Sequence, residues 1–519
     1  MRKAFLTLLL VVMGILTSSG VPITPAQALQ KAALFLSTRG TTPNLSLVRQ
    51  ERQGAPSNQS TKEATYYVFN QGNEQGFVIV SGDDAAYDIL GYADEGHFDL
   101  TDIPENLQAL LDDYAGDIAW ARANVDLPAN APTADASSTN PARQVVAPLL
   151  SCNWNQKSPY NHQCFTTSGA QSVTGCVATA FAQVMYYYKW PRTSTTEIPA
   201  YSTYDALPPV TFDWGSMKDS YSESSSTSNA SNKAVSTLMV YCGHAVKMTY
   251  YVGVASASTS YIPDAMCNYF GYGNHPTEVR REYYDIDGWD QLIYEELAAG
   301  RPVIYSASTS SGGHAFVCDG YDGQGLFHIN WGWGGLSNGY FRLQALNPQS
   351  QGTGGSSTTG GYSNGQLALI GISPQPLEPF CGDSIFGIIN TSFTQLDSNK
   401  VVIEEATNTY VPSDGLRLFR VKYQYTRIGT ASSYDVGLGL FDSEGQMIDT
   451  RVVKSNYKSS SSVNSSNTFY LTSFGRNLDD GTYQIKTIDR VNGTEEWHLS
   501  KNANRYYLQV EKNGDQATL

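Results

Sequence analysis

Between residues 21 and 126, the spacing of apolar positions alternates between the helical and the strand period. Apolar residues recur every three to four positions in TPAQALQKAALFLS and in PENLQALLDDYAGDIAWARANV, which predicts two helices. Thr24 suits the N-cap of the first helix, and Pro25 suits its first position. The runs TYYVFN and GFVIVSG predict a pair of strands around the turn residues QGNEQ. Residues 21–126 are therefore predicted to form a compact α+β unit.

Two segments without a regular apolar period divide the rest of the chain. The first, residues 127–144, contains LPANAPTADASSTN and predicts an exposed linker of the kind that proteases cut. The second is SPQPLEP, whose closely spaced prolines argue against helix or central strand. Between them, residues 145–373 carry dense aromatic residues, glycine-rich turns and every candidate for chemistry. After them, residues 380–519 show short alternating runs separated by turn residues, which predicts an all-β, sandwich-like domain.

The amino terminus has the layout of a secretory signal peptide. Arg2 and Lys3 precede an apolar run that ends at Leu16, and small residues follow up to Gly20. A membrane-spanning helix needs about 20 apolar residues, and neither this run nor any other stretch reaches that length. Residues 1–20 therefore predict export and no integral membrane segment.

Composition narrows the partners and cofactors. The chain has 33 basic and 48 acidic residues and a formal net charge of -15, so no basic excess is present to bind nucleic acid or an anionic membrane surface. Neither a CxxC nor an HExxH spacing occurs, and we expect no bound metal and no cofactor. Seven cysteines in an exported chain leave at least one thiol without a partner in the same chain, which hints at a reactive thiol.

One cysteine lies where a thiol can become nucleophilic. In TGCVATAFAQVMYYYKWP, apolar residues recur at helical spacing after Gly175 and stop before Pro191, so Cys176 falls in the first turn of a predicted helix. The positive end of a helix lowers the pKa of a thiol, and the thiolate is the nucleophile. A buried structural cysteine is the alternative, because free cysteines are among the most buried residues.

A nucleophilic thiol needs an imidazole that holds the ion pair and later protonates the leaving amine. His314 and His328 both follow Cys176 at close to the roughly 130 to 150 residues that separate the two groups in papain-like enzymes, so spacing does not choose between them. His314 follows SSGG, a thin backbone that a substrate can approach, and opens the predicted strand HAFVCDGYD. His328 lies inside the predicted strand LFHINW, where a histidine is more often structural.

Three further residues could complete a site. Asn330 lies on the strand that the turn DGYDGQG pairs with the His314 strand, so its amide could reach the imidazole. Trp331 could shield that hydrogen bond from water, although NWGWGG is equally a strand end with packing tryptophans. Gln156 could donate its amide to an oxyanion together with the backbone N–H of Cys176. Taken alone, Gln156 would be a solvated polar residue.

The stretches around these candidate residues resemble the streptopain family of bacterial cysteine peptidases, which includes interpain-type enzymes and has a papain-like fold. The segment FVIVSGDDAAYDILGYADEGHFDL resembles the inhibitory pro-domain of the family. The resemblance ends near Pro374. Within the central block, the matching segments stand in the family's order: APLLSCNWNQKSPYN, TGCVATAFAQVMYYYKWP, GGHAFVCDGYD, FHINWGWGGLSNGYFRLQALNP and GGYSNGQLALIGI.

The resemblance implies a role for each candidate. It makes Cys176 the nucleophile and His314, of the two histidines, the general base and acid. It makes Gln156 the oxyanion donor, Asn330 the residue that orients the imidazole, and Trp331 its cover. The implied fold class is α+β, a papain-like peptidase domain that follows an α+β inhibitory pro-domain and precedes the all-β domain.

The expected function is a bacterial cysteine endopeptidase, secreted or held at the cell surface and made as a zymogen. Its partners would be protein or peptide substrates and its own pro-domain, an intramolecular inhibitor released by a cut between residues 127 and 146. Two alternatives are a papain-like hydrolase or acyltransferase acting on cell-wall peptide, and a surface adhesin with a silent central domain. The intact set of cysteine, histidine, asparagine and glutamine speaks against the adhesin. The all-β domain would serve adhesion, sorting or substrate capture.

Overall fold

The structure of the protein is a computed structural model. The predicted signal peptide and most of the predicted linker lie outside its described residues. Up to residue 375 the described residues are 21–52, 63–84, 86–123, 143–281, 286–309, 312–345 and 366–375. Beyond that they are 386–388, 392–396, 402–403, 407–413, 415–416, 419–427, 434–457, 465–470, 474–499 and 507–518.

The amino-terminal unit is an antiparallel sheet with one helix on each face. Its elements are α1 (Pro25–Thr38), β1 (Leu45–Glu51), β2 (Tyr66–Gln71), β3 (Phe77–Ser81), β4 (Ile89–Ala93) and α2 (Glu105–Ala123). Side chains alternate between the faces of a strand. In β2, Tyr67 and Phe69 therefore pack under α1, whereas Tyr66 and Val68 pack under α2. The unit is α+β, as predicted.

The start of α1 is the one predicted from the sequence. Pro25 occupies the first turn, and the Thr24 hydroxyl accepts a hydrogen bond from the backbone N–H of Gln27. The Gln27 side chain accepts one from the backbone N–H of Thr24 in return, at 2.8 Å. This reciprocal cap satisfies two backbone donors that a helix start otherwise leaves free.

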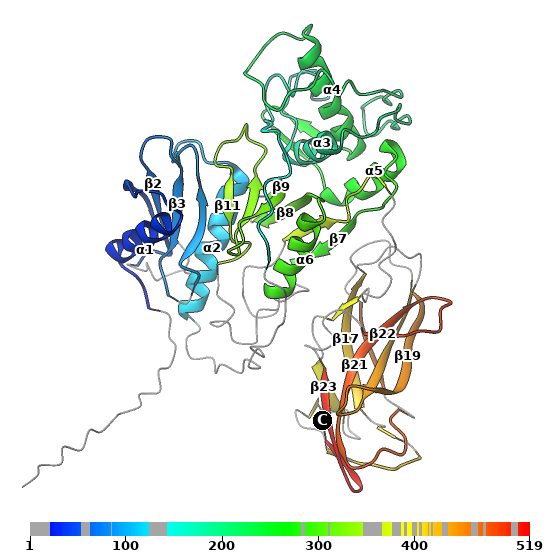
Figure 1. The fold of residues 1–519 in the computed structure, drawn as a ribbon. Coiled ribbons are helices and arrows are strands. Elements are labelled where there is room, and N and C mark those ends of the chain that lie inside the picture. Colours follow the sequence, from blue (N-terminus) through cyan, green and yellow to red (C-terminus); the bar gives the residue numbers. More distant parts are fainter. Residues whose placement is uncertain are drawn as a thin grey trace, which may run out of the picture.

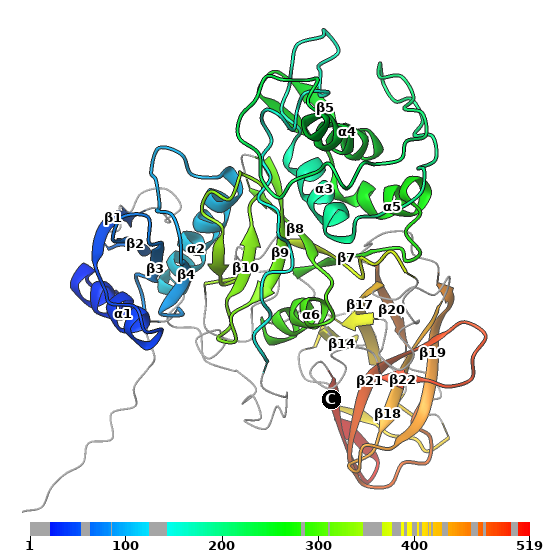
Figure 2. The ribbon, with the colours of Figure 1, turned by 45° about the horizontal axis from the view of Figure 1, so that its top comes forward.

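The central block follows this unit in the sequence and adds further helices and strands. They are α3 (Cys176–Tyr188), α4 (Ala230–Ala245), β5 (Thr249–Tyr251), β6 (Val254–Ser256), α5 (Ile262–Phe270), β7 (Thr277–Arg280), α6 (Ile286–Ala298), β8 (Val303–Thr309), β9 (Gly312–Tyr321), β10 (Phe327–Asn330), β11 (Gly339–Phe341) and β12 (Leu367–Ile370). Helices α3, α4 and α5 gather on one side of β8 and β9, and α2 and α6 lie on the other (Figures 1 and 2).

A single sheet joins the amino-terminal unit to the central block. Its strand order is β1-β2-β3-β4-β11-β10-β9-β8-β12-β7. The junction is the antiparallel pair of β4 and β11, where Tyr92 faces Tyr340 and Gly91 faces Phe341. Figure 1 shows this junction as the meeting of the blue strands with the yellow-green β11. The amino-terminal unit is therefore built onto the edge of the central sheet.

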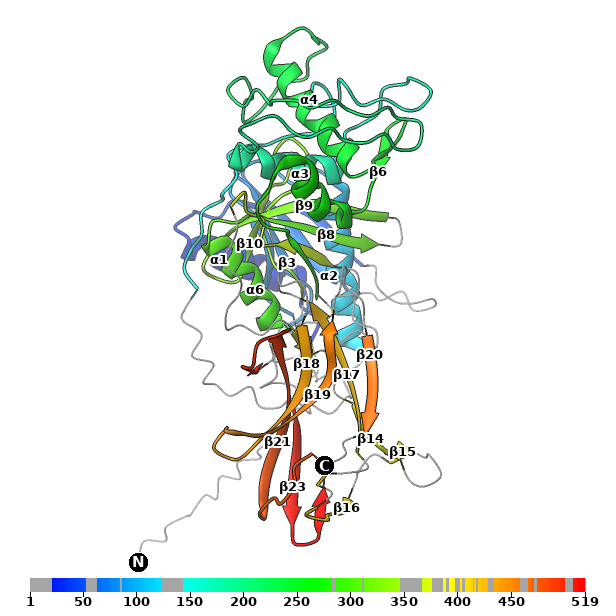
Figure 3. The same ribbon diagram turned by 90° about the vertical axis from the view of Figure 1, so that its right-hand side faces the viewer.

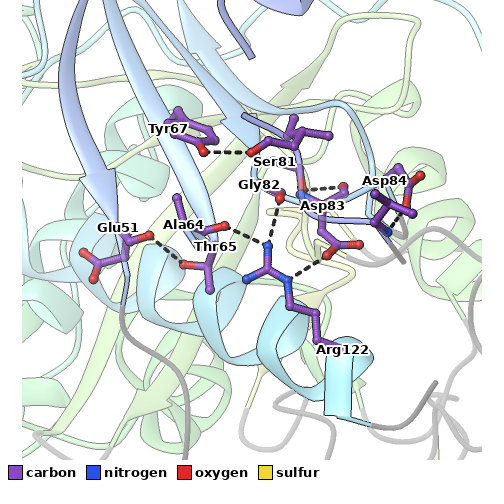
Figure 4. A network of polar contacts seen from close by, with 11 residues as sticks. Glu51, Ala64, Thr65, Tyr67, Ser81, Gly82, Asp83, Asp84 and Arg122 are labelled. Atoms are coloured by element: carbon purple, nitrogen blue, oxygen red, sulfur yellow. Dashed lines mark hydrogen bonds and ion pairs between the residues drawn. The ribbon is translucent and has the colours of Figure 1, made fainter. Parts of the chain in front are cut away.

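A buried arginine fixes the end of α2 to the amino-terminal sheet. Arg122 donates from Nε to the Asp83 carboxylate at 2.7 Å, and from Nη2 to the carbonyl oxygens of Ala64 and Gly82, each at 2.8 Å (Figure 4). The Asp83 side chain is fully buried. Truncating one partner of such a pair would leave an uncompensated buried charge. Helix α2 is thereby held at its carboxyl end, while its first turn points to the central block.

The described residues from 386 to 518 form two further antiparallel sheets. One contains β13 (Phe386–Ile388), β14 (Ser392–Leu396), β15 (Val402–Ile403), β17 (Phe419–Arg427) and β20 (Ser465–Tyr470). The other contains β16 (Thr407–Thr409), β18 (Tyr434–Phe441), β19 (Met447–Tyr457), β21 (Gly481–Val491), β22 (His498–Leu499), β23 (Leu508–Asn513) and β24 (Gln516–Thr518). These strands lie apart from the α3 and α4 side of the central block in Figure 3. The sandwich-like arrangement itself stays a prediction.

Candidate active site

Cys176 begins α3, as the helical pattern predicted. The preceding residue, Gly175, has φ 85°, and a side chain there would lie 2.9 Å from the methyl carbon of Met248 and 3.2 Å from Ala255. Glycine is required because only it adopts this φ without strain. It lets the chain turn sharply beside the β5–β6 hairpin and enter the helix at the thiol.

The Cys176 side chain is partly buried in this form of the protein. Burial raises its pKa, whereas hydrogen bonds from the backbone N–H groups of Ala315, Val177 and Cys176 itself lower it. The expectation that the helix end leaves the thiol with a lowered pKa is therefore wrong here. The helix start does contribute, but desolvation of the charged form is the larger effect.

His314 lies on β9, opposite Ala307 of β8. Because the thiol contacts the backbone N–H of Ala315, the two candidate residues come from directly neighbouring positions of α3 and β9. Burial lowers the pKa of His314, and the nearby Glu105 raises it by a smaller amount. Within the described ranges, no hydrogen bond joins this imidazole to the Cys176 thiol.

The first turn of the amino-terminal unit's α2 enters this site. Asn106, which is 2% exposed, donates from Nδ2 to the carbonyl oxygen of Trp331 at 2.8 Å and more weakly to that of Ala315 at 3.4 Å. Glu105 Oε2 lies 3.9 Å from His314 Nδ1. Sequence reasoning missed both residues. Their positions in the first turn of the predicted second helix carried no catalytic signal.

Asn330 lies at the end of β10 and is almost fully buried. The pairing of β10 with β9, Asn330 opposite Val317, is the one predicted from the turn between them. Its Nδ2 donates to the carbonyl oxygen of Cys152 at 2.8 Å, and its Oδ1 accepts the backbone N–H of Gly332 at 3.1 Å. Among the described residues, the hydrogen bonds of this side chain are thus with backbone groups, and none is with His314.

Trp331 is fully buried between aromatic rings. Its ring centroid lies 4.9 Å from that of Phe316 and 5.1 Å from that of Phe341. The indole Nε1 donates to the carbonyl oxygen of Ser337 at 2.9 Å. Trp331 therefore packs on the β9 face that carries the α2 contacts, next to the site.

Gln156 belongs to a loop that touches the start of the nucleophile segment. Its carbonyl oxygen accepts the backbone N–H of Thr174, two residues before Cys176, at 3.0 Å. The residue is 7% exposed, so it is not the solvated side chain that the sequence alone would favour. The loop and the first turn of α3 therefore lie side by side.

His328 is held by a different partner. Its Nδ1 lies 2.6 Å from the Asp319 carboxylate, which is fully buried and also accepts the backbone N–H of Leu150 at 2.9 Å. The His328 ring meets Tyr340 edge-on. These contacts agree with the structural role predicted for a histidine inside a strand.

Among the described cysteines, Cys176 is the one at the start of a helix. Cys381 lies outside the described residues. The described cysteines are all free, and they are Cys152, Cys164, Cys176, Cys242, Cys267 and Cys318. Burial raises the pKa of each of the other five thiols. Among the described residues, no cluster of three or more histidine, cysteine or acidic side chains could hold a metal ion, and no helix is long and apolar enough to cross a bilayer.

A thiol at a helix start, packed against a strand that carries a histidine and covered by an amino-terminal domain, defines a papain-like cysteine peptidase with its pro-domain attached. The sequence profile of the Peptidase C10 family matches residues 154–341, and that of the Spi protease inhibitor matches residues 20–118. Streptopain of Streptococcus pyogenes is 35% identical over 335 residues, which are 59% of this chain and 80% of streptopain. The chain therefore belongs to the Peptidase C10 family, and it is a cysteine peptidase.

Two further relatives extend this result. The thiol protease/hemagglutinin PrtT of Porphyromonas gingivalis is 34% identical over 391 residues, and the match covers 72% of this chain but only 44% of PrtT. A solved fragment of prointerpain A from Prevotella intermedia is 29% identical, with a TM-score of 0.51 over 64% of this chain and 99% of the fragment. The matched fragment of prointerpain A is a pro-form. Structural similarity, and not sequence alone, therefore supports the interpretation of this fold as a pro-form.

Proposed function

We propose that the protein is a secreted cysteine endopeptidase made as a zymogen, with Cys176 as nucleophile and His314 as general base and acid. The observation that carries the proposal is the contact of the Cys176 thiol with the backbone N–H of Ala315. This contact sets the first turn of α3 against the strand position that follows His314. A thiol and an imidazole on such neighbouring positions need only a side-chain rotation to meet.

The proposed reaction follows from these groups. His314 takes the thiol proton, and the Cys176 thiolate attacks the carbonyl carbon of the peptide bond. The oxyanion that forms accepts hydrogen bonds from the backbone N–H of Cys176 and from the Gln156 amide. The imidazolium then protonates the leaving amine as the C–N bond breaks. Water, deprotonated by His314, hydrolyses the thioester and regenerates the thiol.

Asn330 and Trp331 are proposed to act on the imidazole. Asn330 pairs opposite Val317, so it lies on the strand next to that of His314. We expect the imidazole to turn toward Asn330 after the pro-domain leaves, and Trp331 to shield that contact. The Asn330 side chain would then exchange one of its present backbone partners for the ring.

Inhibition by the pro-domain has an electrostatic and a steric part. The start of α2 occupies the space next to His314 and helps to bury both groups, which raises the thiol pKa and lowers the imidazole pKa. Both shifts favour the neutral pair over the ion pair. Removing α2 would return water and a substrate carbonyl to the site, so the ion pair could form.

A labelling experiment tests the proposed nucleophile. An irreversible thiol-directed peptidase inhibitor should label the matured protein once, and Cys176→Ala should remove both the label and the peptide hydrolysis. The loss of turnover should be at least about 1,000-fold, as for other nucleophile deletions. Cys267→Ala, a partly exposed cysteine on α5, is the matched control and should keep both. Residual hydrolysis above about a tenth in Cys176→Ala would contradict the proposal.

Export is the second part of the proposal. It rests on the signal-peptide layout of residues 1–20. Expression in a bacterial host should yield a protein in the medium or at the cell surface that lacks the first 18 to 20 residues by mass spectrometry. Retention of the intact amino terminus inside the cell would contradict it.

A further inference from the structure

The loop from Cys152 to Gln156, here named the 152–156 loop, carries the proposed oxyanion donor. An oxyanion donor must lie within about 2.7–3.1 Å of a position fixed by the nucleophile. The loop has no helix or strand of its own, so its place depends on the groups that hold it. Those groups therefore help to set the geometry of the proposed oxyanion site.

A buried glutamine on the nucleophile helix contacts this loop. Gln183 is fully buried, and its Oε1 accepts the backbone N–H of Trp154 at 3.2 Å. The Cys152 thiol also points at Oε1, at 3.9 Å. Gln183 lies seven residues after Cys176, so the two side chains are on the same face of α3, two turns apart. One rigid helix thus presents both the nucleophile and a group that holds the loop.

The other contacts of the loop complete a frame around Trp154. The Trp154 carbonyl oxygen accepts the backbone N–H of Gly334 at 2.8 Å, and Gln156 accepts that of Thr174 at 3.0 Å. Asn330 donates to the Cys152 carbonyl oxygen. Gln183 is the member of this frame that connects the loop to the interior of α3, because Thr174 precedes the helix.

Packing energy alone does not account for a glutamine at this position. Its Nε2 is buried and has no hydrogen-bond partner among the described residues. A buried donor without a hydrogen bond destabilises the folded state. On the side of Gly332, a Cβ would lie 3.9 Å from Nε2, but glycine has no Cβ. A side chain without this amide would fill the same space without that cost.

We propose that Gln183 is a positioning residue, which holds the 152–156 loop so that the Gln156 amide and the Cys176 N–H face the same oxyanion. The inference rests on the oxyanion role proposed for Gln156. Gln183 touches no substrate. It acts through the Trp154 backbone, and its removal lets the loop shift while the nucleophile stays in place.

The test is a double-mutant cycle on the full chain after maturation. Gln183→Met keeps the volume and removes the acceptor, and we expect turnover to fall about 10- to 100-fold, part of the roughly 100- to 1,000-fold that one oxyanion donor contributes. KM should stay within about twofold. In a Gln156→Ala background the same change should reduce turnover less than about threefold, because the two residues act as a unit.

Two controls separate position from stability. Val184→Ala, buried on the same helix without a polar contact, should lower the melting temperature and leave turnover unchanged. Alkylation of Cys176 by iodoacetamide, which forms no oxyanion, should proceed at the wild-type rate in Gln183→Met. If Gln183→Met does not fold, Gln183→Asn withdraws the acceptor by one methylene and takes its place.

The outcomes distinguish this inference from the proposed function. Additive losses in the double variant, with Gln156→Ala itself impaired, would overturn the inference alone. Unimpaired turnover in Gln156→Ala would overturn the oxyanion role of Gln156, and the inference with it. A large rise of KM with unchanged turnover in Gln183→Met would assign Gln183 to substrate binding and would also overturn the inference.

Discussion

At the scale of single residues, the surroundings of the two candidate histidines differ in kind. His314 lies beside the thiol segment, and among the described residues its nearest carboxylate, Glu105, is 3.9 Å away. His328 is bonded to a fully buried carboxylate. A catalytic imidazole must be free to change partners, whereas a structural one is fixed by them.

This contrast predicts opposite effects of two substitutions. His314→Ala should reduce turnover as strongly as the loss of Cys176, because residues that act as a unit do not lose activity additively. His328→Ala should retain most turnover and lower the melting temperature, because it leaves the buried Asp319 without its partner. Peptide hydrolysis and thermal unfolding of both variants check this. The reverse pattern would make His328 the catalytic histidine.

Asn106 is the residue with which the pro-domain contacts the peptidase backbone at the site. Asn106→Ala should weaken inhibition about tenfold, because each lost hydrogen bond contributes about 0.5–1.5 kcal/mol and two carbonyl groups remain buried. The inhibition constant of the separately expressed pro-domain against the matured enzyme measures the effect.

Gln30→Ala provides the control for this experiment, because Gln30 is exposed on α1, away from the peptidase. It should inhibit like the wild type. Equal inhibition by the Asn106 variant would show that the Asn106 hydrogen bonds contribute nothing to inhibition. Inhibition would then depend on the contact of β4 with β11.

At the scale of elements, α2 presents two carboxylates to the peptidase domain. Asp113 and Asp117 are one helical turn apart, and Asp117 Oδ2 accepts the backbone N–H of Ala345 at 3.4 Å. Asp113 bonds to the side chain of Gln366, which is buried and accepts the Tyr305 hydroxyl. Burial first, and Asp117 second, raise the pKa of Asp113 to about 8. Other charged groups of this region are Asp112, Arg281 and Arg342.

The raised pKa predicts that the precursor loses stability as pH rises. The Asp113 carboxyl of the unfolded chain titrates near pH 4, so its contribution is fully present below about pH 4 and is lost progressively up to about pH 8. Urea unfolding of the Cys176→Ala precursor between pH 5 and 8 should show this trend. Asp113→Asn, which cannot ionise, should show a smaller decrease over the same range. Equal slopes for the two proteins would contradict the prediction.

At the scale of the whole molecule, the end of the predicted linker and the residues after it are bound to the peptidase domain. Arg143 donates from Nε to the Gln291 side chain at 2.9 Å and bonds to the Tyr321 hydroxyl. Val146 exchanges two backbone hydrogen bonds with Tyr321, each at 2.8 Å. A protease needs an extended, accessible segment. The cut near Arg143 that a basic-specific protease would favour is therefore hindered.

Maturation should accordingly leave Arg143 in the mature chain. We expect the mature amino terminus to begin at or before this residue, and Arg143→Gln to change the rate of maturation by less than about twofold. The Cys176→Ala precursor should accumulate uncut alone and be trimmed when active enzyme is added. Mass spectrometry of the products gives the position. A mature chain that starts at Gln144 would contradict the prediction.

How much could be predicted from the sequence differs between parts of the molecule. The N-cap of α1, the start of α3 at Cys176 and the pairing of β9 with β10 follow from local patterns, and the structure has them. The lowered thiol pKa was predicted wrongly, because burial, which raises it, outweighs the backbone hydrogen bonds at the helix start. Asn106 and Glu105 were not predicted at all.

The sequence by itself determined the elements, their order and the class of chemistry, because periodicity, capping and motif order are local properties of the chain. Only the tertiary structure decided which residues meet and how burial shifts their pKa values. Asn106 reaches Trp331 across 225 positions of sequence, and no local pattern encodes such a contact. Desolvation of the Cys176 thiol is likewise a property of the assembled structure, because it depends on what packs around the side chain.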